Sequence, residues 1–285
     1  MRLVTYVDDD RLTAGLLLGE QVLPTRELGA PGSVRELLAS HDAAGLQALA
    51  ERAEDSPAER LALEGLRLAA PVPDPEKIIC IGLNYRDHAA ETGQEIPKAP
   101  MWFAKFRNSL IGSGEDVVLP AAYPDHVDYE AELALVIGAR ARNVEPEQAL
   151  ACLAGVMPFN DVSARDLQWQ NPLWTSGKAI DTFAPCGPAL VTLQDVGDLA
   201  DLTLRTRIDG ETLQEGTTAD MVFGPAELIA WLSLTITLLP GDIIATGTPA
   251  GVGASKGRFL RDGNLVEVEI DGVGTLANPV RSEQA

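Results

Sequence analysis

Acidic side chains are concentrated in a segment that otherwise has the composition of a buried strand, DYEAELALVIG at residues 128–138. Side chains alternate between the two faces of a strand, so Asp128, Glu130 and Glu132 are predicted to share one face. Like charges crowded on a buried strand repel one another and lose hydration, and a bound cation would compensate them. The alternative is an exposed acidic edge strand that binds no metal.

A further acid, Asp161, occurs about thirty residues later in FNDVSARD, after an apolar run and before a predicted loop. From that position its carboxylate can reach the same ion as Glu130 and Glu132. Oxygen ligands without nearby His or Cys pairs favour Mg²⁺ or Mn²⁺ over Zn²⁺, and magnesium keeps waters that a substrate can displace. The sequence therefore indicates a site for one divalent cation.

A histidine and a glutamate that can exchange protons lie in GLNYRDHAAETG, where His88 and Glu91 are three residues apart. This spacing places both on one face of a helical turn that follows a strand. A carboxylate beside an imidazole orients the ring and raises its basicity, so the dyad can take a proton from water or from carbon. The alternative is an ordinary surface pair.

Two lysines and a glycine-rich turn offer binding sites for an anion. Lys105 in FAKF and Lys178 in WTSGKAID stand among apolar and small residues, where an ammonium needs an anionic partner such as a substrate carboxylate or enolate. They can equally be lysines that extend to solvent at strand ends. Thr246 and Thr248 in IIATGTPAGVG can hold an anionic group, but the turn lacks the lysine of a nucleotide-binding P-loop.

Composition restricts the class of protein. The 285 residues are 46% hydrophobic, enough for a sizeable core, and the net charge of -20 argues against nucleic acid or an anionic membrane as a partner. No segment approaches the ~18 apolar residues of a spanning helix, and the start MRLVTYVDDD lacks a signal-peptide pattern, so we expect a cytoplasmic protein. The cysteines have no metal-type spacing and are predicted to be buried small hydrophobic residues: Cys80, Cys152 and Cys186.

The elements that position these residues divide into two parts. Residues 1–70 are predicted to form a small α/β appendage, with short strands in RLVTYV and TAGLLLGEQVLPT and helical spacing over residues 33–53 after a Ser33 cap. The proline-rich stretch LRLAAPVPDPEK marks a junction. The main domain is predicted to span residues 71–285 and to begin near Pro71.

Strands dominate the predicted main domain. Seven segments have strand patterns: KIICIGLN, DVVLP, DYEAELALVIGAR, ALVTL, LTLRTRIDGETL, GDIIATG and LVEVEIDGVGTL. Two helices are predicted, in PEQALACLAGV and in GPAELIAWLSLTITL, where Pro225 suits a first helical position. The IDG and RDG turns suggest antiparallel hairpins, so an α+β or mixed-β roll is favoured over a doubly wound parallel sheet.

Several motifs occur together in a recognisable order: GLNYRDHAAE, VDYEAELALVIG, FNDVSARDLQ, WTSGKAIDTFAPCGP, EGTTADMVF, LLPGDIIATGTPAGVG and DGNLVEVEIDGVGTLANPV. By these motifs, over about residues 71 to 281, the chain resembles the fumarylacetoacetate hydrolase family. The resemblance implies an α+β fold with the mixed β-sandwich roll of the family's C-terminal domain, a divalent cation and a homodimer. The apolar segment FGPAELIAWLSLTITL beside strand edges agrees with a dimer.

The resemblance also assigns roles to individual residues. It implies metal ligands at Glu130, Glu132 and Asp161, a catalytic dyad at His88 and Glu91, an active-site lysine at Lys178, and substrate contacts from Lys105, Arg165, Gln168 and Thr248. The sequence departs from the family pattern at Val156, Ser176 and Ala179, which we expect to lie at the pocket wall and to affect substrate choice.

The expected chemistry is cleavage or isomerisation of a small oxo-carboxylic acid through an enolate stabilised by Mg²⁺ or Mn²⁺. With water activated by the dyad, the reaction is hydrolysis of a carbon–carbon bond in a 2,4-dioxo acid of the acylpyruvate type, which we rank first. Isomerisation or decarboxylation of an oxo-dicarboxylic acid, of the hydroxyhepta-diene-dioate or oxaloacetate type, ranks second. A non-catalytic metal-binding or ligand-binding homologue and an interaction module are the rival classes.

Overall fold

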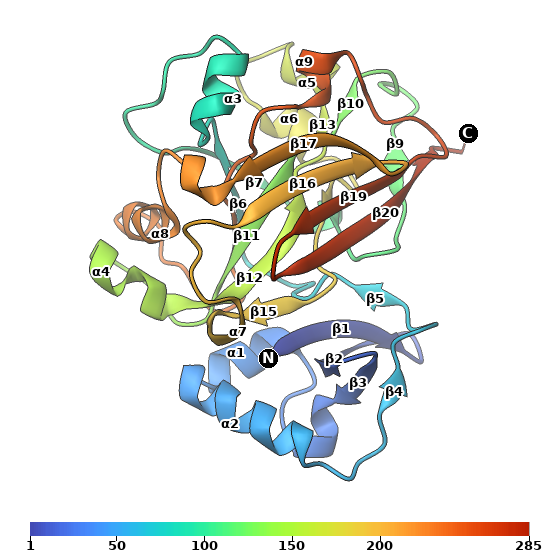
Figure 1. Cartoon of the computed structure of the whole chain (residues 1–285), viewed down its shortest axis with the longest axis vertical. Coiled ribbons are helices and arrows are strands. Elements are labelled where there is room, and N and C mark those ends of the chain that lie inside the picture. Colours follow the sequence, from blue (N-terminus) through green and yellow to red (C-terminus); the bar gives the residue numbers. More distant parts are fainter. Residues whose placement is uncertain (285) are drawn as a thin grey trace.

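Residues 1–70 form the lower part of the computed structural model, which describes residues 1–284 (Figure 1). Ser33 caps the first helix by accepting a hydrogen bond from Glu36 N, as predicted. Asp42 accepts from Gly45 N and starts a second helix, so residues 33–53 form two helices. The elements of this part are β1 (Arg2–Asp8), β2 (Arg11–Leu18), β3 (Gln21–Pro24), η1 (Thr25–Leu28), α1 (Val34–Ser40), α2 (Ala43–Glu54), β4 (Leu61–Ala62) and β5 (Leu68–Ala69).

The sheet of the lower part continues into the upper part. Its further strands are β15 (Leu190–Thr192), β12 (Leu153–Asn160), β11 (Ala131–Ile137), β18 (Ile243–Ala245), β6 (Ile78–Gly82) and β7 (Met101–Lys105). The strand order is β4-β3-β2-β1-β15-β12-β11-β18-β6-β7, with β5 paired to β1. The antiparallel pair of β1 and β15 joins the two parts, and β18 and β6 run parallel. The central strand β11 is buried along its whole length, which excludes an exposed acidic edge strand.

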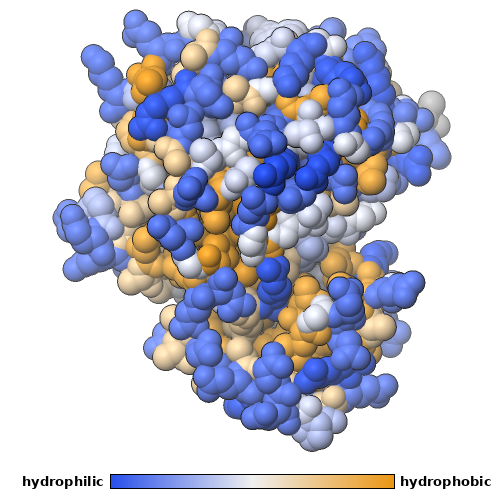
Figure 2. Space-filling model, viewed as in Figure 1, coloured by the Kyte–Doolittle hydropathy of each residue, from blue (hydrophilic) through white to orange (hydrophobic). Residues whose placement is uncertain are grey.

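A second sheet packs against β11 and β12. It has the order β17 (Glu211–Thr217), β16 (Thr203–Ile208), β19 (Leu265–Ile270), β20 (Gly274–Ser282) and β9 (Val117–Leu119). The predicted IDG hairpin joins β16 to β17. Every second residue of β16 and β19 is buried, and the outer face carries ion pairs from Arg205 and Arg207 to Glu269. Hydrophilic residues cover this side in Figure 2, as expected for a sheet with one solvated face.

The helices of the upper part are short. The longest is α8 (Pro225–Ser233), which begins with Pro225 as predicted. The helix predicted in PEQALACLAGV begins at Pro146 as expected, but it is shorter than predicted: it consists of α4 (Pro146–Ala149) and η3 (Leu150–Cys152), because Leu153 pairs with Ile137 and starts β12. The other elements are α3 (Arg86–Glu91), η2 (Arg107–Ser109), β8 (Leu110–Ile111), β10 (Val127–Asp128), β13 (Ser163–Ala164), α5 (Arg165–Gln168), α6 (Thr175–Lys178), β14 (Ala184–Pro185), α7 (Leu193–Val196), η4 (Thr218–Asp220) and α9 (Gly253–Lys256).

One hydrophobic core includes residues from both parts of the chain. Leu3 of β1 and Leu37 of α1 belong to the same buried cluster as Ile78 of β6 and Phe159 of β12. Two of the cysteines are buried as predicted, whereas Cys152 is only partly buried. Within residues 1–284, no helix is long and apolar enough to cross a membrane.

The shared core predicts that the two parts unfold together. Leu3→Ala removes a fully buried side chain at the β1–β15 junction and should lower the free energy of unfolding by about 2–5 kcal/mol. All four tryptophans lie beyond residue 100, so their fluorescence during denaturation reports on the upper part. The control is Leu12→Ala in β2, because Leu12 is exposed. An unchanged fluorescence transition in Leu3→Ala would show that the lower part unfolds independently.

Candidate active site

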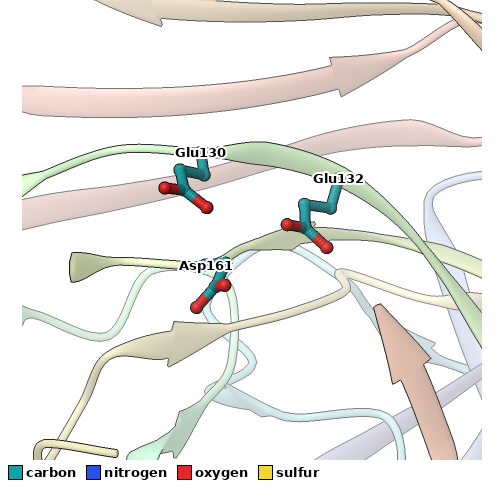
Figure 3. Close-up of side chains that lie close together, drawn as sticks. All are labelled: Glu130, Glu132 and Asp161. Atoms are coloured by element: carbon teal, nitrogen blue, oxygen red, sulfur yellow. The ribbon is translucent and has the colours of Figure 1, made fainter. Parts of the chain in front are cut away.

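Three acidic side chains meet where β11 begins and β12 ends (Figure 3). Glu132 of β11 and Glu130, which directly precedes this strand, extend toward Asp161, which follows β12, and one ligand oxygen from each lies within 4.8 Å of the others. All three are buried. Asp161 N donates to Glu130 O at 2.9 Å, and Glu130 N donates to the side-chain oxygen Asn160 Oδ1 at 3.0 Å, so two hydrogen bonds hold the 130 and 160–161 segments together.

Two cations compensate part of this negative charge. Lys178 Nζ lies 2.7 Å from Glu130 Oε2 and 2.8 Å from Asp161 Oδ2, and Arg165 Nη2 lies 2.7 Å from Glu130 Oε1. Burial by itself raises the pKa of Glu130, but Lys178 and Arg165 outweigh it and lower the pKa to about 2. Burial lowers the pKa of both cations, but Asp161 and Glu130 outweigh it for Lys178, and Asp128 and Glu130 outweigh it for Arg165, so the pKa of each is raised.

Glu132 lacks such compensation. In the part of the chain that the structure describes, its carboxylate accepts one hydrogen bond, from Gly247 N at 2.9 Å. Burial, followed by the charges of Asp161 and Glu130, raises the pKa of Glu132 well above its usual range. A divalent cation between the three carboxylates would remove this repulsion, and a set of oxygen donors suits Mg²⁺ or Mn²⁺.

The wider charge balance points the same way. Among the side chains of this cluster, the buried carboxylates of Asp128, Glu130, Glu132 and Asp161 face three buried cations, Lys105, Arg165 and Lys178. The cluster thus has one negative charge in excess. A bound divalent cation would turn the excess positive and so favour an anionic ligand.

A cavity of about 220 Å³ opens beside the carboxylates. Most of the predicted site residues line it: His88, Glu130, Glu132, Arg165, Gln168, Lys178 and Thr248. Its outer wall includes Trp169 and Trp174. The size and polarity of this cavity suit a small acid rather than a large cofactor.

The predicted dyad faces this cavity from α3. His88 Nδ1 lies 3.1 Å from Glu91 Oε2, and Glu91 Oε1 accepts a hydrogen bond from Gly251 N at 2.9 Å. Only 13% of the His88 side chain and 19% of the Glu91 side chain are exposed, which argues against an ordinary surface pair. Glu91 therefore holds one ring nitrogen of His88 and leaves the other for the cavity.

Lys105 and Thr246 lie behind the cavity wall. Lys105 Nζ donates to Asp161 Oδ1 and to the carbonyl oxygens of Val162 and Phe183, and Lys105 is not among the cavity-lining residues. Burial lowers the pKa of Lys105, and Asp161 opposes this effect. The Thr246 hydroxyl donates to a backbone carbonyl of β11, so it does not reach an anion in the cavity.

The three departures from the family pattern also lie outside the cavity lining. Val156 is in the hydrophobic core between β11 and β15, and neither Ser176 nor Ala179 lines the cavity. The expectation that these residues form the pocket wall is therefore wrong. A change at these positions can alter the cavity only through its neighbours.

Two buried anchors of the site were not recognised in the sequence. Asp128 accepts from Arg165 Nε at 2.8 Å and from the backbone of Gly253 and Ala254, so it holds Arg165 and the 253–254 wall. Asn84 donates to Thr246 O at 2.8 Å and to Phe223 O at 3.0 Å. An Asn directly after a buried strand, as in GLNYR, is the only sequence signal for the second anchor.

Glycine is required at position 247. Its φ of +97° lies in the region that side chains rarely adopt, and an added Cβ would lie 2.9 Å from Asn84 Cβ. This conformation directs Gly247 N at Glu132. The TGTP turn thus supplies a backbone donor to the carboxylate cluster as well as a cavity wall.

Metal binding predicts opposite effects of one substitution with and without the ion. Glu132→Gln removes a repelled charge, so in EDTA its melting temperature should equal or exceed that of the wild type. Mg²⁺ or Mn²⁺ at 100-fold its Kd should stabilise the wild type by about 2.7 kcal/mol and should have little effect on Glu132→Gln. Thermal denaturation with and without each ion measures this. Glu147→Gln, at an exposed position, is the matched control. A metal-induced rise that survives in Glu132→Gln contradicts the site.

Known proteins share this fold. Residues 77–281 match the family model described as fumarylacetoacetate (FAA) hydrolase C-terminal. The mitochondrial oxaloacetate tautomerase fahd2 of Xenopus laevis is 43% identical over 254 residues, which cover 88% of this chain and 79% of the relative. The 2-hydroxyhepta-2,4-diene-1,7-dioate isomerase of Mycobacterium marinum has a TM-score of 0.79 at 34% identity, over 100% of both chains.

A third similar protein was solved with ligands. The maleylpyruvate hydrolase of Sphingobium sp. SYK-6, in complex with manganese (II) and pyruvate, has a TM-score of 0.84 at 32% identity over 100% of both chains. These likenesses confirm the predicted α+β fold of the C-terminal type. The relatives are named as enzymes that act on small organic acids. The chain belongs to the fumarylacetoacetate hydrolase family.

Proposed function

We propose that this protein is a divalent-metal-dependent enzyme that interconverts the keto and enol forms of a 2-oxo dicarboxylic acid of the oxaloacetate class. The observation that carries the proposal is the His88–Glu91 dyad, held at the wall of the cavity that Glu130 and Glu132 also line. The Xenopus relative, a named oxaloacetate tautomerase, supports this substrate class. The solved hydrolase with manganese and pyruvate supports Mn²⁺ as the cofactor, and the all-oxygen donor set of Glu130, Glu132 and Asp161 suits one ion of either Mn²⁺ or Mg²⁺.

The side chains of the cavity suit an anionic substrate. Lys178 and Arg165 supply fixed positive charge, and the Thr248 hydroxyl can donate to a carboxylate. Gln168 Oε1 accepts from Arg165 Nη1 at 2.7 Å, which leaves its amide nitrogen as a donor for the substrate. Lys105 is better suited to hold Asp161 than to touch the substrate, because it lies behind the cavity wall.

Tautomerisation moves a proton between carbon 3 of the acid and the oxygen on carbon 2. The cation, when bound, supplies Lewis-acid stabilisation of the enolate. His88 takes the proton from carbon 3 through the ring nitrogen that Glu91 leaves free. It then delivers this proton to the oxygen on carbon 2, which completes the conversion of keto to enol. Glu91 stabilises the imidazolium formed between these steps, and Lys178 stabilises the developing negative charge.

Hydrolysis of an acylpyruvate-type acid is the second candidate. The same dyad can activate water, and the Sphingobium relative is named a maleylpyruvate hydrolase. We place it second because the tautomerase relative is more similar in sequence, at 43% identity against 32%. Decarboxylation of oxaloacetate breaks the bond between carbons 3 and 4, releases CO2 and leaves the enolate of pyruvate, so it also needs enolate stabilisation but no base that activates water. Assays of oxaloacetate enol, of 2,4-dioxo acids and of oxaloacetate decarboxylation, each with Mg²⁺ and Mn²⁺, separate these reactions.

Substitution of the base should separate proton transfer from enolate stabilisation. His88→Ala should slow tautomerisation about 10²–10⁴-fold, the usual contribution of a positioned general base, and should leave Mg²⁺ affinity unchanged. Any oxaloacetate decarboxylation should fall much less, because it needs no proton from carbon. Lys178→Ala should weaken both reactions together, because both pass through an anionic species. Equal losses of tautomerisation and decarboxylation in His88→Ala would show that the dyad does not carry out the proton transfer.

We also propose that the protein is a homodimer in the cytoplasm. Within the described residues, β7 pairs with β6 alone and is an edge strand. Exposed apolar side chains surround it, Trp102 at 45% and Leu173 at 73% exposure, with Trp231 in the same surface hollow. An apolar edge strand invites pairing unless another chain covers it, and a second copy would do so.

A charge placed on this edge should separate the subunits. Trp102→Glu should turn a wild-type dimer into a monomer at micromolar concentration, because a buried, unpaired carboxylate opposes association. Light scattering measures the mass, and Leu265→Glu, at an exposed apolar position of β19, is the control. A wild-type monomer, or a dimer that persists in Trp102→Glu, would contradict this interface.

A further inference from the structure

We propose that Gln214 of β17 is a positioning residue that forces the Thr248 hydroxyl to donate its hydrogen into the active-site cavity. The inference rests on the proposed function, in which Thr248 binds the carboxylate or enolate oxygen of a 2-oxo acid. Gln214 does not line the cavity itself. It acts from the second sheet, through one buried amide.

The amide of Gln214 makes four hydrogen bonds. Its Oε1 accepts from Ala131 N at 3.0 Å and from Thr206 Oγ1 at 2.7 Å. Its Nε2 donates to Thr248 Oγ1 and to Pro249 O, each at 2.9 Å. The side chain is 1% exposed, so water does not compete for these groups. Every donor and acceptor of the amide is therefore used in one orientation.

The chemistry of its partners fixes that orientation. A backbone N–H can only donate, and a backbone carbonyl can only accept. Ala131 N therefore requires the amide oxygen on its side, and Pro249 O requires the amide nitrogen on the other. A flipped amide would leave both backbone groups buried without partners, at substantial cost. Thr248 Oγ1 consequently faces an N–H group and must accept a hydrogen bond from it.

This leaves the Thr248 hydroxyl hydrogen for a different acceptor. Within residues 1–284, Thr248 Oγ1 donates no hydrogen bond, and Thr248 lines the cavity. Its hydrogen therefore serves an acceptor in the cavity, such as a carboxylate or enolate oxygen. Ala131 lies between Glu130 and Glu132, so the same amide also sets the distance between the metal cluster and this donor.

A double-mutant cycle on Gln214 and Thr248 tests the inference by binding alone. The variants are Gln214→Glu, Thr248→Val, their combination, and Thr248→Ser, which keeps the hydroxyl. The introduced Glu carboxylate accepts from Ala131 N as before, but it reverses the hydrogen bond to Thr248. The readout is the Kd of pyruvate in saturating Mg²⁺, measured by calorimetry, with Mg²⁺ affinity and melting temperature as controls.

Each single change, Gln214→Glu or Thr248→Val, should weaken pyruvate binding about 10 to 100-fold, the range for one hydrogen bond to a charged group. The double variant should bind no worse than Thr248→Val, since no hydroxyl remains to orient, and Thr248→Ser should bind like the wild type. The defect of Gln214→Glu should shrink as pH falls, because a protonated carboxyl donates again. If Gln214→Glu does not fold, Gln214→Met can replace it, because it frees the Thr248 hydroxyl from the amide. Gln214→Met should weaken pyruvate binding when Thr248 is present and should have no further effect in Thr248→Val.

Three results would overturn the inference. The first is that Gln214→Glu binds pyruvate with the affinity of the wild type. The second is that Gln214→Glu weakens pyruvate binding as much in the Thr248→Val background as in the wild type. The third is that the wild type binds no pyruvate in Mg²⁺. A failure of the proposed tautomerisation has a different signature. Oxaloacetate would then not be interconverted, while pyruvate binding and its dependence on both residues would remain.

Discussion

Repulsion among three buried carboxylates is the constraint on which the rest of this structure depends. Lys178 contacts Glu130 and Asp161 but leaves Glu132 with a single backbone donor, Gly247 N. Charges of one sign do not remain together in a low-dielectric interior without compensation. A divalent ion bound to this cluster would relieve the repulsion that the cations leave uncompensated, and it would lie beside the cavity.

The scaffold meets this constraint by holding each site residue through its backbone or through a buried partner. Glu132 lies on the central strand β11, where pairing with β12 fixes it, and Glu130 directly precedes this strand and is fixed by hydrogen bonds with Asn160 and Asp161. The loops that complete the cavity are held by Asn84 and Asp128. The second sheet contributes through Gln214, so the packing of the two sheets sets the distance between the carboxylates and the opposite wall. Such rigid support keeps a site preorganised for one charge distribution.

Part of this arrangement could be predicted from the sequence, because its physical cause is local. The period of two along a strand placed Glu130 and Glu132 on one side, and helical spacing brought His88 to Glu91. The fold itself followed from the order of the motifs. Hydrophobic pattern alone gave a helix over residues 146–156, although pairing with β11 makes residues 153–160 a strand.

The features that sequence reasoning missed depend on contacts between distant segments. Nothing near Lys105 in the sequence indicates that its ammonium binds Asp161 behind the cavity wall, or that β1 pairs with β15. The one-turn helices α5 and α6 carry Arg165, Gln168 and Lys178, and they are too short to give a periodic signal. The reaction type is also not encoded in such patterns, because tautomerisation, hydrolysis and decarboxylation each require stabilisation of a 2-oxo acid enolate.

The position of the metal ion can be determined directly by anomalous diffraction from crystals of the protein grown with Mn²⁺ and pyruvate. We expect one manganese peak per chain, roughly 2 Å from an oxygen of each of Glu130, Glu132 and Asp161, with the pyruvate in the cavity beside it. A peak elsewhere, or pyruvate bound in the cavity with no ion at the three carboxylates, would contradict this expectation.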